Sequence, residues 1–170
     1  MKKFIMSVVL SVSILFLPST SQAYLLDNVQ QFNGHYYKVF NYSMRWNDAK
    51  DFCENLGGHL VTITSQMEQN FIETLIKSNE KGSYWIGGYK SQNSNWAWVT
   101  GEQFNYSKWA QGEPNNGLGM YVEDKINIYN YPNANNAPFG TWNDAMELGD
   151  TKSYGFICEW DYPNSIKVRY

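Results

Sequence analysis

Five acidic or amide side chains in the second half of the chain could together bind a metal ion. Glu113-Pro114-Asn115 supplies a carboxylate and an amide oxygen two residues apart, Glu123 follows, and Asn143-Asp144 stands directly after Trp142. Ca²⁺ prefers about six to eight hard oxygen ligands. These side chains and the Asp144 backbone carbonyl provide most of that number, and their three carboxylates balance the charge of the ion. These residue types could form a Ca²⁺ site with open coordination positions, although Glu-Pro-Asn-Asn-Gly alone is also an ordinary turn sequence.

The same carboxylates could instead serve an enzyme, since glycosidases use a pair of acidic residues. Here Glu113 and Glu123 alternate with asparagines, which suit a metal cage better than an acid–base pair. The two histidines, His35 and His59, lie outside this segment, and no nucleophile–base arrangement is recognisable. We therefore expect a binding protein and not an enzyme. Asp124 follows Glu123 directly and is an alternative third acidic ligand.

The first 23 residues have the pattern of a signal peptide. Lys2 and Lys3 precede an apolar run, and Ser21 and Ala23 give the small residues expected before a cleavage site. The run is shorter than the roughly 20 residues that a membrane-spanning helix needs. We expect an exported mature chain from residue 24, without membrane insertion, that is secreted to the extracellular space or the periplasm. The Met-Lys-Lys start is typical of a bacterial leader.

Composition and cysteine content limit the class of protein further. The 170 residues suit one domain, and the net charge of -3 excludes an electrostatic nucleic-acid binder. In an oxidising compartment, Cys53 and Cys158 are expected to form a disulfide, with two separate buried thiols as the alternative. The chain-entropy model gives about 4.7 kcal/mol for closing such a loop of roughly 100 residues.

The hydrophobic pattern predicts two helices in the first half of the mature chain. A strand is expected over 35–40, and Trp46, Ala49 and Cys53 recur at helical spacing after it. Gly57-Gly58 provides the positive φ with which helices commonly end. Ser65 through Glu68 has the S-x-x-E pattern of a capping box that opens a second helix.

Strands and one long loop are expected in the second half. Apolar and aromatic runs predict strands over 84–88, 96–99 and 154–160. Residues 111–140 are rich in Gly and Asn and show little periodicity, which is typical of a functional irregular loop. The tetrapeptide Trp-Asn-Asp-Ala occurs at 46–49 and 142–145. The first copy is predicted to open a helix, and the second to lie in a strand.

These motifs, taken in order, resemble the C-type lectin-like domain family. The stretch WNDAKDFCENLGGHLVTITSQMEQNFI is similar to the helix–strand–helix entry of that domain, and WIGG, WAWVTGEQFNYSKWAQGEPNN, WND and FICEW follow in the family's order. The resemblance implies an α+β double-loop domain, with two helices, antiparallel strands and a long Ca²⁺-binding loop. The expected boundaries are a signal peptide over 1–23, a leader over 24–33, the domain over 34–160 and a tail over 161–170.

The resemblance also implies roles for single residues. It assigns Ca²⁺ and carbohydrate binding to the five side chains already described, Glu113, Asn115, Glu123, Asn143 and Asp144, and it implies a cis bond before Pro114. In this family the order Glu-Pro-Asn goes with vicinal equatorial hydroxyls of mannose-type sugars, whereas Gln-Pro-Asp goes with galactose. Cys53 and Cys158 match the family's end-to-end disulfide.

Several departures from the family's pattern affect the loop. Lys125 and Glu147 stand nearest to the positions of a second, short disulfide, so this covalent link is not expected. Lys90 and Asn116 stand where relatives often carry acids for an auxiliary ion, and we therefore expect one principal Ca²⁺. Two loop tyrosines, Tyr129 and Tyr131, could stack on a sugar, although packing within the loop is favoured.

These observations lead to one expected function and one alternative. The expected function is a secreted, Ca²⁺-dependent lectin that binds mannose-type glycans or glycoconjugates, with an oligomeric state that the sequence leaves open. The alternative is a C-type lectin-like adhesion or protein-interaction module in which Ca²⁺ only orders the long loop.

Overall fold

The computed structural model describes residues 27–119, 122–131, 137–147 and 154–162. The predicted signal peptide, the first residues of the leader and the end of the tail lie outside the described residues. No helix among the described segments is long and apolar enough to cross a membrane. In chain order the elements are β1 (Gln30–Phe32), β2 (His35–Phe40), α2 (Trp46–Asn55), β3 (His59–Leu60), α3 (Gln66–Ile76), β4 (Ser83–Lys90), β5 (Trp96–Trp98), the 3₁₀ turn η1 (Asn116–Gly119), β6 (Lys125–Tyr129), β7 (Trp142–Ala145) and β8 (Tyr154–Trp160).

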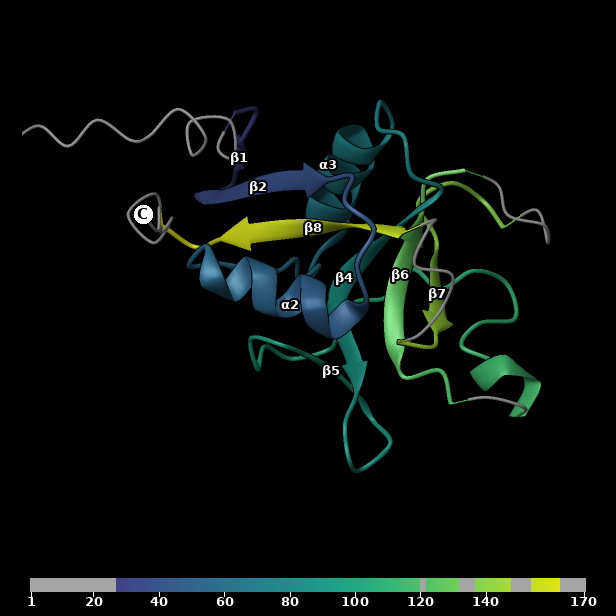
Figure 1. The fold of residues 1–170 in the computed structure, drawn as a ribbon. Coiled ribbons are helices and arrows are strands. Elements are labelled where there is room, and N and C mark those ends of the chain that lie inside the picture. The colour runs from purple at the N-terminus through teal and green to yellow at the C-terminus, as the bar shows by residue number, and fades with distance from the viewer. Residues whose placement is uncertain (1–26, 120–121, 132–136, 148–153, 163–170) are drawn as a thin grey trace, which may run out of the picture.

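One twisted sheet organises the domain (Figure 1). Its main path runs β1-β2-β8-β4-β6-β7, with β3 added to β8 and β5 added to β4. The first and last long strands are neighbours, since β2 pairs with β8 from Tyr36↔Trp160 to Phe40↔Phe156. The predicted α+β class is confirmed. The expectation of antiparallel strands holds for every ladder except β4–β8, which is parallel, because β8 returns to the sheet through a long connection and not a hairpin.

The two helices cover opposite faces of the central strands. Helix α2 places Trp46, Ala49 and Cys53 in one buried cluster, and α3 places Ile72 and Ile76 in another. Side chains alternate between the two clusters along β8 and β4, as the two-residue period of a strand requires. On these strands Trp85, Phe156 and Cys158 face α2, whereas Tyr84, Ile86 and Ile157 face α3.

Local signals at the helix ends behave largely as predicted. Ser65 caps α3, and its hydroxyl accepts a hydrogen bond from the Glu68 N–H at 3.2 Å. The Glu68 carboxylate returns to the Thr64 N–H at 2.9 Å instead of completing a reciprocal box with Ser65. After α2, only the first glycine of the predicted pair, Gly57, has a positive φ, of 81°. The second, Gly58, is required because its Cα packs against the β8 backbone at Glu159.

The expectation of irregular structure throughout 111–140 is wrong for residues 125–129. These residues form β6, which lies between β4 and β7 and whose five residues are all buried. Ile126 and Ile128 are fully buried in the α3 cluster. The strand is short and flanked by Asn-rich sequence, so its stability comes from pairing on both sides. Tyr129 is also buried, as expected for a packing residue, and the Tyr131 hydroxyl donates to the Asn79 carbonyl at 3.1 Å.

Cys53 and Cys158 lie together but are free thiols in the structure, so the predicted disulfide is absent from it. Both side chains are fully buried in the α2 cluster. Burial and the neighbouring Cys53 thiol raise the pKa of Cys158. A protonated thiol is a poor nucleophile, so burial lowers the reactivity of Cys158.

Gln69 connects α3 to the base of the long loop. Its side chain is fully buried; its amide donates to the Gly140 carbonyl at 2.8 Å, and its oxygen accepts from the Trp142 indole N–H at 2.9 Å. These two bonds fix the end of the loop where β7 begins. Because Trp142 is itself fully buried, water cannot replace the bond to its indole.

We expect Gln69→Leu to lower the free energy of unfolding by about 2–4 kcal/mol, because it leaves the Trp142 donor and the Gly140 acceptor buried and unpaired. Urea denaturation monitored by tryptophan fluorescence measures this loss. Gln66→Leu on the same helix is the matched control, since Gln66 is exposed, and should change stability by no more than about 0.5 kcal/mol. Equal losses in the two variants would show that Gln69 does not hold the loop base.

Candidate metal centre in the long loop

Residues 111–119 and 122–124, called the loop segment from here on, are held at their entrance by a group of aromatic rings around Trp142. Trp98, Phe104, Tyr106 and Trp109 all pack against this indole, with ring centroids 5.7–6.2 Å from it. The backbone adds two bonds, from the Trp142 N–H to the Lys108 carbonyl at 2.7 Å and from the Ala110 N–H to the Trp142 carbonyl at 2.8 Å. The loop segment therefore starts from a well-packed base at Trp142. The next two residues of β7 are the predicted ligands Asn143 and Asp144.

Asp144 attaches the loop segment to β7. Its carboxylate is fully buried and accepts two backbone hydrogen bonds, from the Asn115 N–H at 2.9 Å and from the Asn116 N–H at 2.8 Å. A charged acceptor makes such bonds stronger than neutral ones. The bond between Glu113 and Pro114, immediately before this contact, is cis, as the family resemblance implied.

Glu113 and Glu123 are brought towards Asp144 by this arrangement. Burial, a hydrogen bond with Asp144 and the charges of Asp144 and Glu123 together raise the pKa of Glu113 to about 7, with burial the largest cause. The pKa of Glu123 is raised mainly by burial, and also by the charge of Asp144. One buried carboxylate oxygen of Glu113, Oε2, has no hydrogen-bond partner among the described residues. A cation would favour the ionised form of all three groups.

The adjacent acid Asp124 points elsewhere. Its Oδ2 lies 2.9 Å from Lys125 Nζ, and its backbone carbonyl accepts from the Lys90 N–H at 2.8 Å. Glu123, by contrast, donates its N–H to Asn116 Oδ1 at 3.0 Å and is influenced electrostatically by Asp144. Of the two acids that the sequence offered as third ligand, the geometry favours Glu123.

Asn143 lies in β7 and contacts Asn127, a residue that sequence reasoning missed. Its amide nitrogen lies 2.5 Å from the Asp144 carbonyl and donates to Asn127 Oδ1 at 3.2 Å. Asn127 is fully buried in β6, and its own amide nitrogen has no hydrogen-bond partner among the described residues. A buried asparagine within the apolar run KINIY was the signal that could have identified it. Asn116 was also missed as a ligand-positioning residue, although it contacts both Asp144 and Glu123.

The structure thus gathers the five predicted side chains at one end of β7, but it does not draw them to a single point. Among the described residues, the acids Glu113, Glu123 and Asp144 do not form a trio whose oxygens all lie within 4.8 Å of one another. The donor set of carboxylate and amide oxygens fits a hard ion such as Ca²⁺, and the unpartnered Glu113 oxygen supports that fit.

Fold and loop together define a domain of the lectin type, with a carboxylate and amide cluster on an irregular loop. Residues 42–160 match the family of the Lectin C-type domain, and the chain belongs to this family. Snaclec A6 of Macrovipera lebetinus is 39% identical over 136 residues, which cover 74% of this chain and 77% of the relative. C-type lectin lectoxin-Lio1 of Erythrolamprus poecilogyrus is 36% identical over 122 residues, which cover 69% of this chain and 75% of the relative.

A solved structure gives the same result. The carbohydrate-recognition domain of the mouse scavenger receptor C-type lectin superimposes with a TM-score of 0.64 at 30% sequence identity, covering 80% of this chain and 97% of that one. The relatives support a lectin-type binding module. The two curated relatives come from snakes and lend no support to the bacterial leader or to the periplasmic location that the N-terminus suggested.

The raised pKa of Glu113 makes stability depend on pH when Ca²⁺ is removed. The ordinary pKa of Glu113 is 4.5 and its pKa in the folded state is about 7, so the folded state keeps the proton to a higher pH than the unfolded state does. The free energy of unfolding therefore falls as pH rises through this interval. We expect Glu113→Gln, which carries no charge, to gain stability relative to the wild type between about pH 5 and about pH 8 in EGTA.

Urea unfolding of the wild type and Glu113→Gln at the two pH values measures this difference. The buried Glu159, whose pKa is also raised to about 7, is present in both proteins and cancels in the comparison. A stability difference between the two proteins that does not change with pH would rule out the proposed charge cluster.

Proposed function

We propose that this protein is a secreted, Ca²⁺-dependent lectin that binds mannose-type sugars through the loop segment and β7. The observation that carries the proposal is the convergence of Glu113, Glu123 and Asp144 with an unpartnered buried carboxylate oxygen on Glu113. Family membership over residues 42–160 supports it, as does the similarity to a carbohydrate-recognition domain. An oxidising secretory compartment would supply the oxidant that joins Cys53 to Cys158.

The five predicted side chains have complementary roles in this proposal. Bound Ca²⁺ supplies the positive charge to which two vicinal sugar hydroxyls coordinate. Glu113 and Glu123 accept the hydroxyl protons, while the amides of Asn115 and Asn143 donate to the hydroxyl oxygens. The Asn143 amide oxygen and the Asp144 backbone carbonyl would supply two further oxygen ligands to the ion.

Asp144 and Asn116 position the others. The Asp144 carboxylate holds the backbone of Asn115 and Asn116, and Asn116 Oδ1 holds the backbone of Glu123. The backbone of Asn115 is therefore attached to the buried Asp144 carboxylate directly, and the backbone of Glu123 is attached to it through Asn116. Rigid placement of donors and acceptors is what allows a site to discriminate between sugar epimers.

A module in which Ca²⁺ only orders the loop for protein contact is the second candidate. The loop residue Val122 is 74% exposed, and an exposed apolar side chain beside the site suits a protein partner as well as a sugar. The two candidates differ in whether free sugars compete for the site.

We expect mannose-containing glycans to be bound in Ca²⁺ and released by EGTA, as measured on a glycan array. Glu123→Gln should lower Ca²⁺ affinity by about tenfold or more because it removes a charged ligand. Asp124→Asn is the matched control, since that side chain pairs with Lys125, and should leave Ca²⁺ and glycan binding nearly unchanged. A folded protein with no EGTA-sensitive glycan signal would contradict the lectin proposal and favour the protein-interaction candidate.

Specificity depends on the order of acid and amide around Pro114. We expect the double variant Glu113→Gln, Asn115→Asp to exchange donor and acceptor positions, and so to be eluted by galactose in preference to mannose. Competitive elution from an immobilised glycan measures the change, with Ca²⁺ binding checked separately. Unaltered elution by mannose would show that these two side chains do not determine the choice of sugar.

A further inference from the structure

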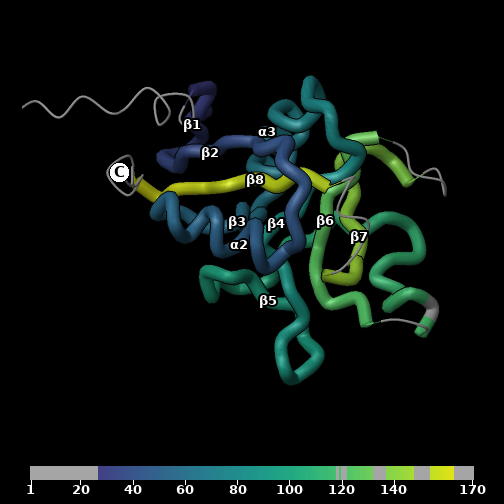
Figure 2. The backbone as a smooth tube through the Cα atoms, viewed as in Figure 1, coloured from purple at the N-terminus to yellow at the C-terminus, as the bar shows by residue number. Residues whose placement is uncertain are grey.

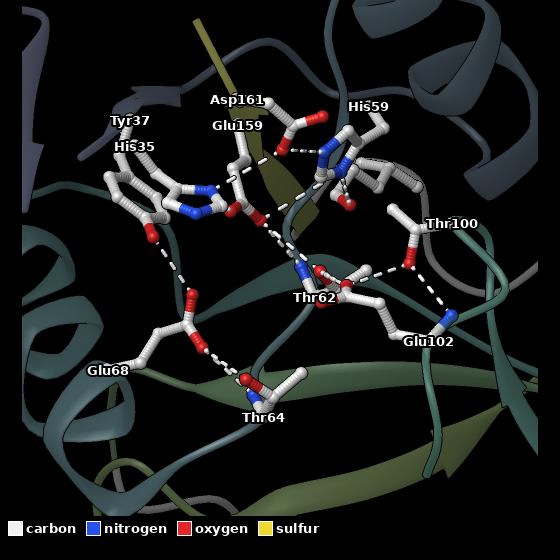
Figure 3. Close-up of polar contacts among 11 residues, drawn as sticks. His35, Tyr37, His59, Thr62, Thr64, Glu68, Thr100, Glu102, Glu159 and Asp161 are labelled. Atoms are coloured by element: carbon white, nitrogen blue, oxygen red, sulfur yellow. Dashed lines mark hydrogen bonds and ion pairs between the residues drawn. The ribbon is translucent and has the colours of Figure 1, made fainter. Parts of the chain in front are cut away.

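A second group of potential ligands lies where the first and last long strands of the domain meet. His35 begins β2, His59 begins β3, Glu159 is in β8, and Asp161 follows β8. Figure 3 shows the two imidazole rings on either side of the two carboxylates. Among the described residues, the ligand atoms of His35, Glu159 and Asp161 all lie within 4.8 Å of one another, and His59 Nε2 lies 3.4 Å from Asp161 Oδ1.

The contacts in this group are poor hydrogen bonds. His35 Nδ1 lies 2.8 Å from Glu159 Oε1, yet this buried nitrogen has no hydrogen-bond partner among the described residues. The other two separations, from Asp161 Oδ1 to His35 Nδ1 and to His59 Nε2, are both 3.4 Å, well beyond the usual N–H···O distance of about 2.9 Å.

The longer distances suit a metal ion placed between the atoms. Ligands bound tetrahedrally at the usual Zn–N and Zn–O lengths are separated from one another by about 3.3–3.5 Å. The His35–Glu159 pair would have to open by roughly half an ångström to reach that spacing. The His35 side chain is 39% exposed and can rotate outwards to do so.

The charge of Glu159 provides a second reason to expect a cation. Glu159 is 2% exposed, and a buried carboxylate is costly unless it is paired or coordinates a metal. Its Oε2 accepts a hydrogen bond from the Thr62 N–H at 3.0 Å, which leaves Oε1 directed towards His35. A polar cavity of about 90 Å³ adjoins His35 and Glu159 and has room for a water ligand.

His59 contacts Asp161 and, at a longer distance, Glu159. Its Nδ1 lies 2.9 Å from the Leu60 carbonyl, so the proton of the neutral ring belongs on Nδ1 and the lone pair of Nε2 faces Asp161. A lone pair that faces a carboxylate is unfavourable unless a proton or a metal lies between them.

We propose that His35, Glu159 and Asp161 form a binding site for a divalent transition-metal ion, with Zn²⁺ the best match to one imidazole and two carboxylates with a water as fourth ligand. His59 lies beside Asp161 and positions it. The site joins β2, β3 and the end of β8, far along the sheet from the sugar-binding loop. Bound metal would tie the first strands of the domain to its last strand, next to the Cys53–Cys158 contact.

Calorimetric titration of metal-stripped, tag-free protein with Zn²⁺, in saturating Ca²⁺, tests the proposal. We expect one equivalent of Zn²⁺ to bind and to raise the melting temperature. His35→Ala and Asp161→Asn, which alter exposed side chains, should each weaken Zn²⁺ binding by about 100-fold or more, and His59→Asn by about tenfold or more. Glu54→Gln, at an exposed acid of α2, should leave the affinity unchanged.

Two other sources of Zn²⁺ binding are separable from this site. Binding that survives His35→Ala and Asp161→Asn, or that is lost in Glu113→Gln, would place the ion elsewhere and overturn the proposal. Substitution with Co²⁺ distinguishes the thiols, since a thiolate-to-cobalt absorption band would assign the metal to Cys53 and Cys158. A protein that binds no Zn²⁺ would show that the four residues form only proton-mediated ion pairs.

Discussion

The buried carboxylate of Asp144 is the interaction on which the loop site depends. Its two oxygens hold the backbone N–H groups of Asn115 and Asn116, so a loop with little regular structure is attached to the last residues of a strand. Removing a charge from water is costly unless it is well hydrogen-bonded. The structure meets that requirement with backbone donors, which cannot move away as side chains can. The acids Glu113 and Glu123 are then held near this charge, although they repel it.

The rigidity of β7 explains why such repulsion is tolerated. Aromatic rings surround Trp142 on several sides, and Gln69 fixes its indole from α3. The stability of the sheet and of the two helix-covered clusters thus supports a loop that would be unfavourable alone. Functional loops are usually positioned by a packed scaffold. Here Trp142 and Gln69 connect the scaffold to the loop.

Much of this fold could be predicted from sequence because its signals are local. The helical face of Trp46, Ala49 and Cys53, the Ser65 cap and the positive φ of Gly57 each depend on residues within a few positions of one another. Strand β6 could not be predicted in the same way, because five residues become a strand only when β4 and β7 pair with them. For the site, the family order of the motifs singled out the five candidate ligands and implied that they meet at one site, because each motif alone is weak evidence and Glu-Pro-Asn-Asn-Gly is an ordinary turn sequence.

The supporting residues were harder to find than the ligands. Asn116 and Asn127 act through contacts that exist only after the loop has folded back on β6 and β7. The same holds for His35 and Glu159, which lie near opposite ends of the domain sequence and meet only because β2 pairs with β8. Sequence patterns report the period of an element, whereas these contacts depend on the order of strands in the sheet.

The first strands, β1 and β2, lie next to the end of β8. Their position determines which way the loop segment faces relative to the two ends of the described chain. The described chain enters and leaves the fold on one side, while η1 and the loop segment lie on the far side of the sheet (Figures 1 and 2). A segment, surface or second copy joined at either end would therefore leave the loop unobstructed. Copies tethered in this way would present their loops in a common direction, which is the geometry that simultaneous engagement of clustered ligands requires.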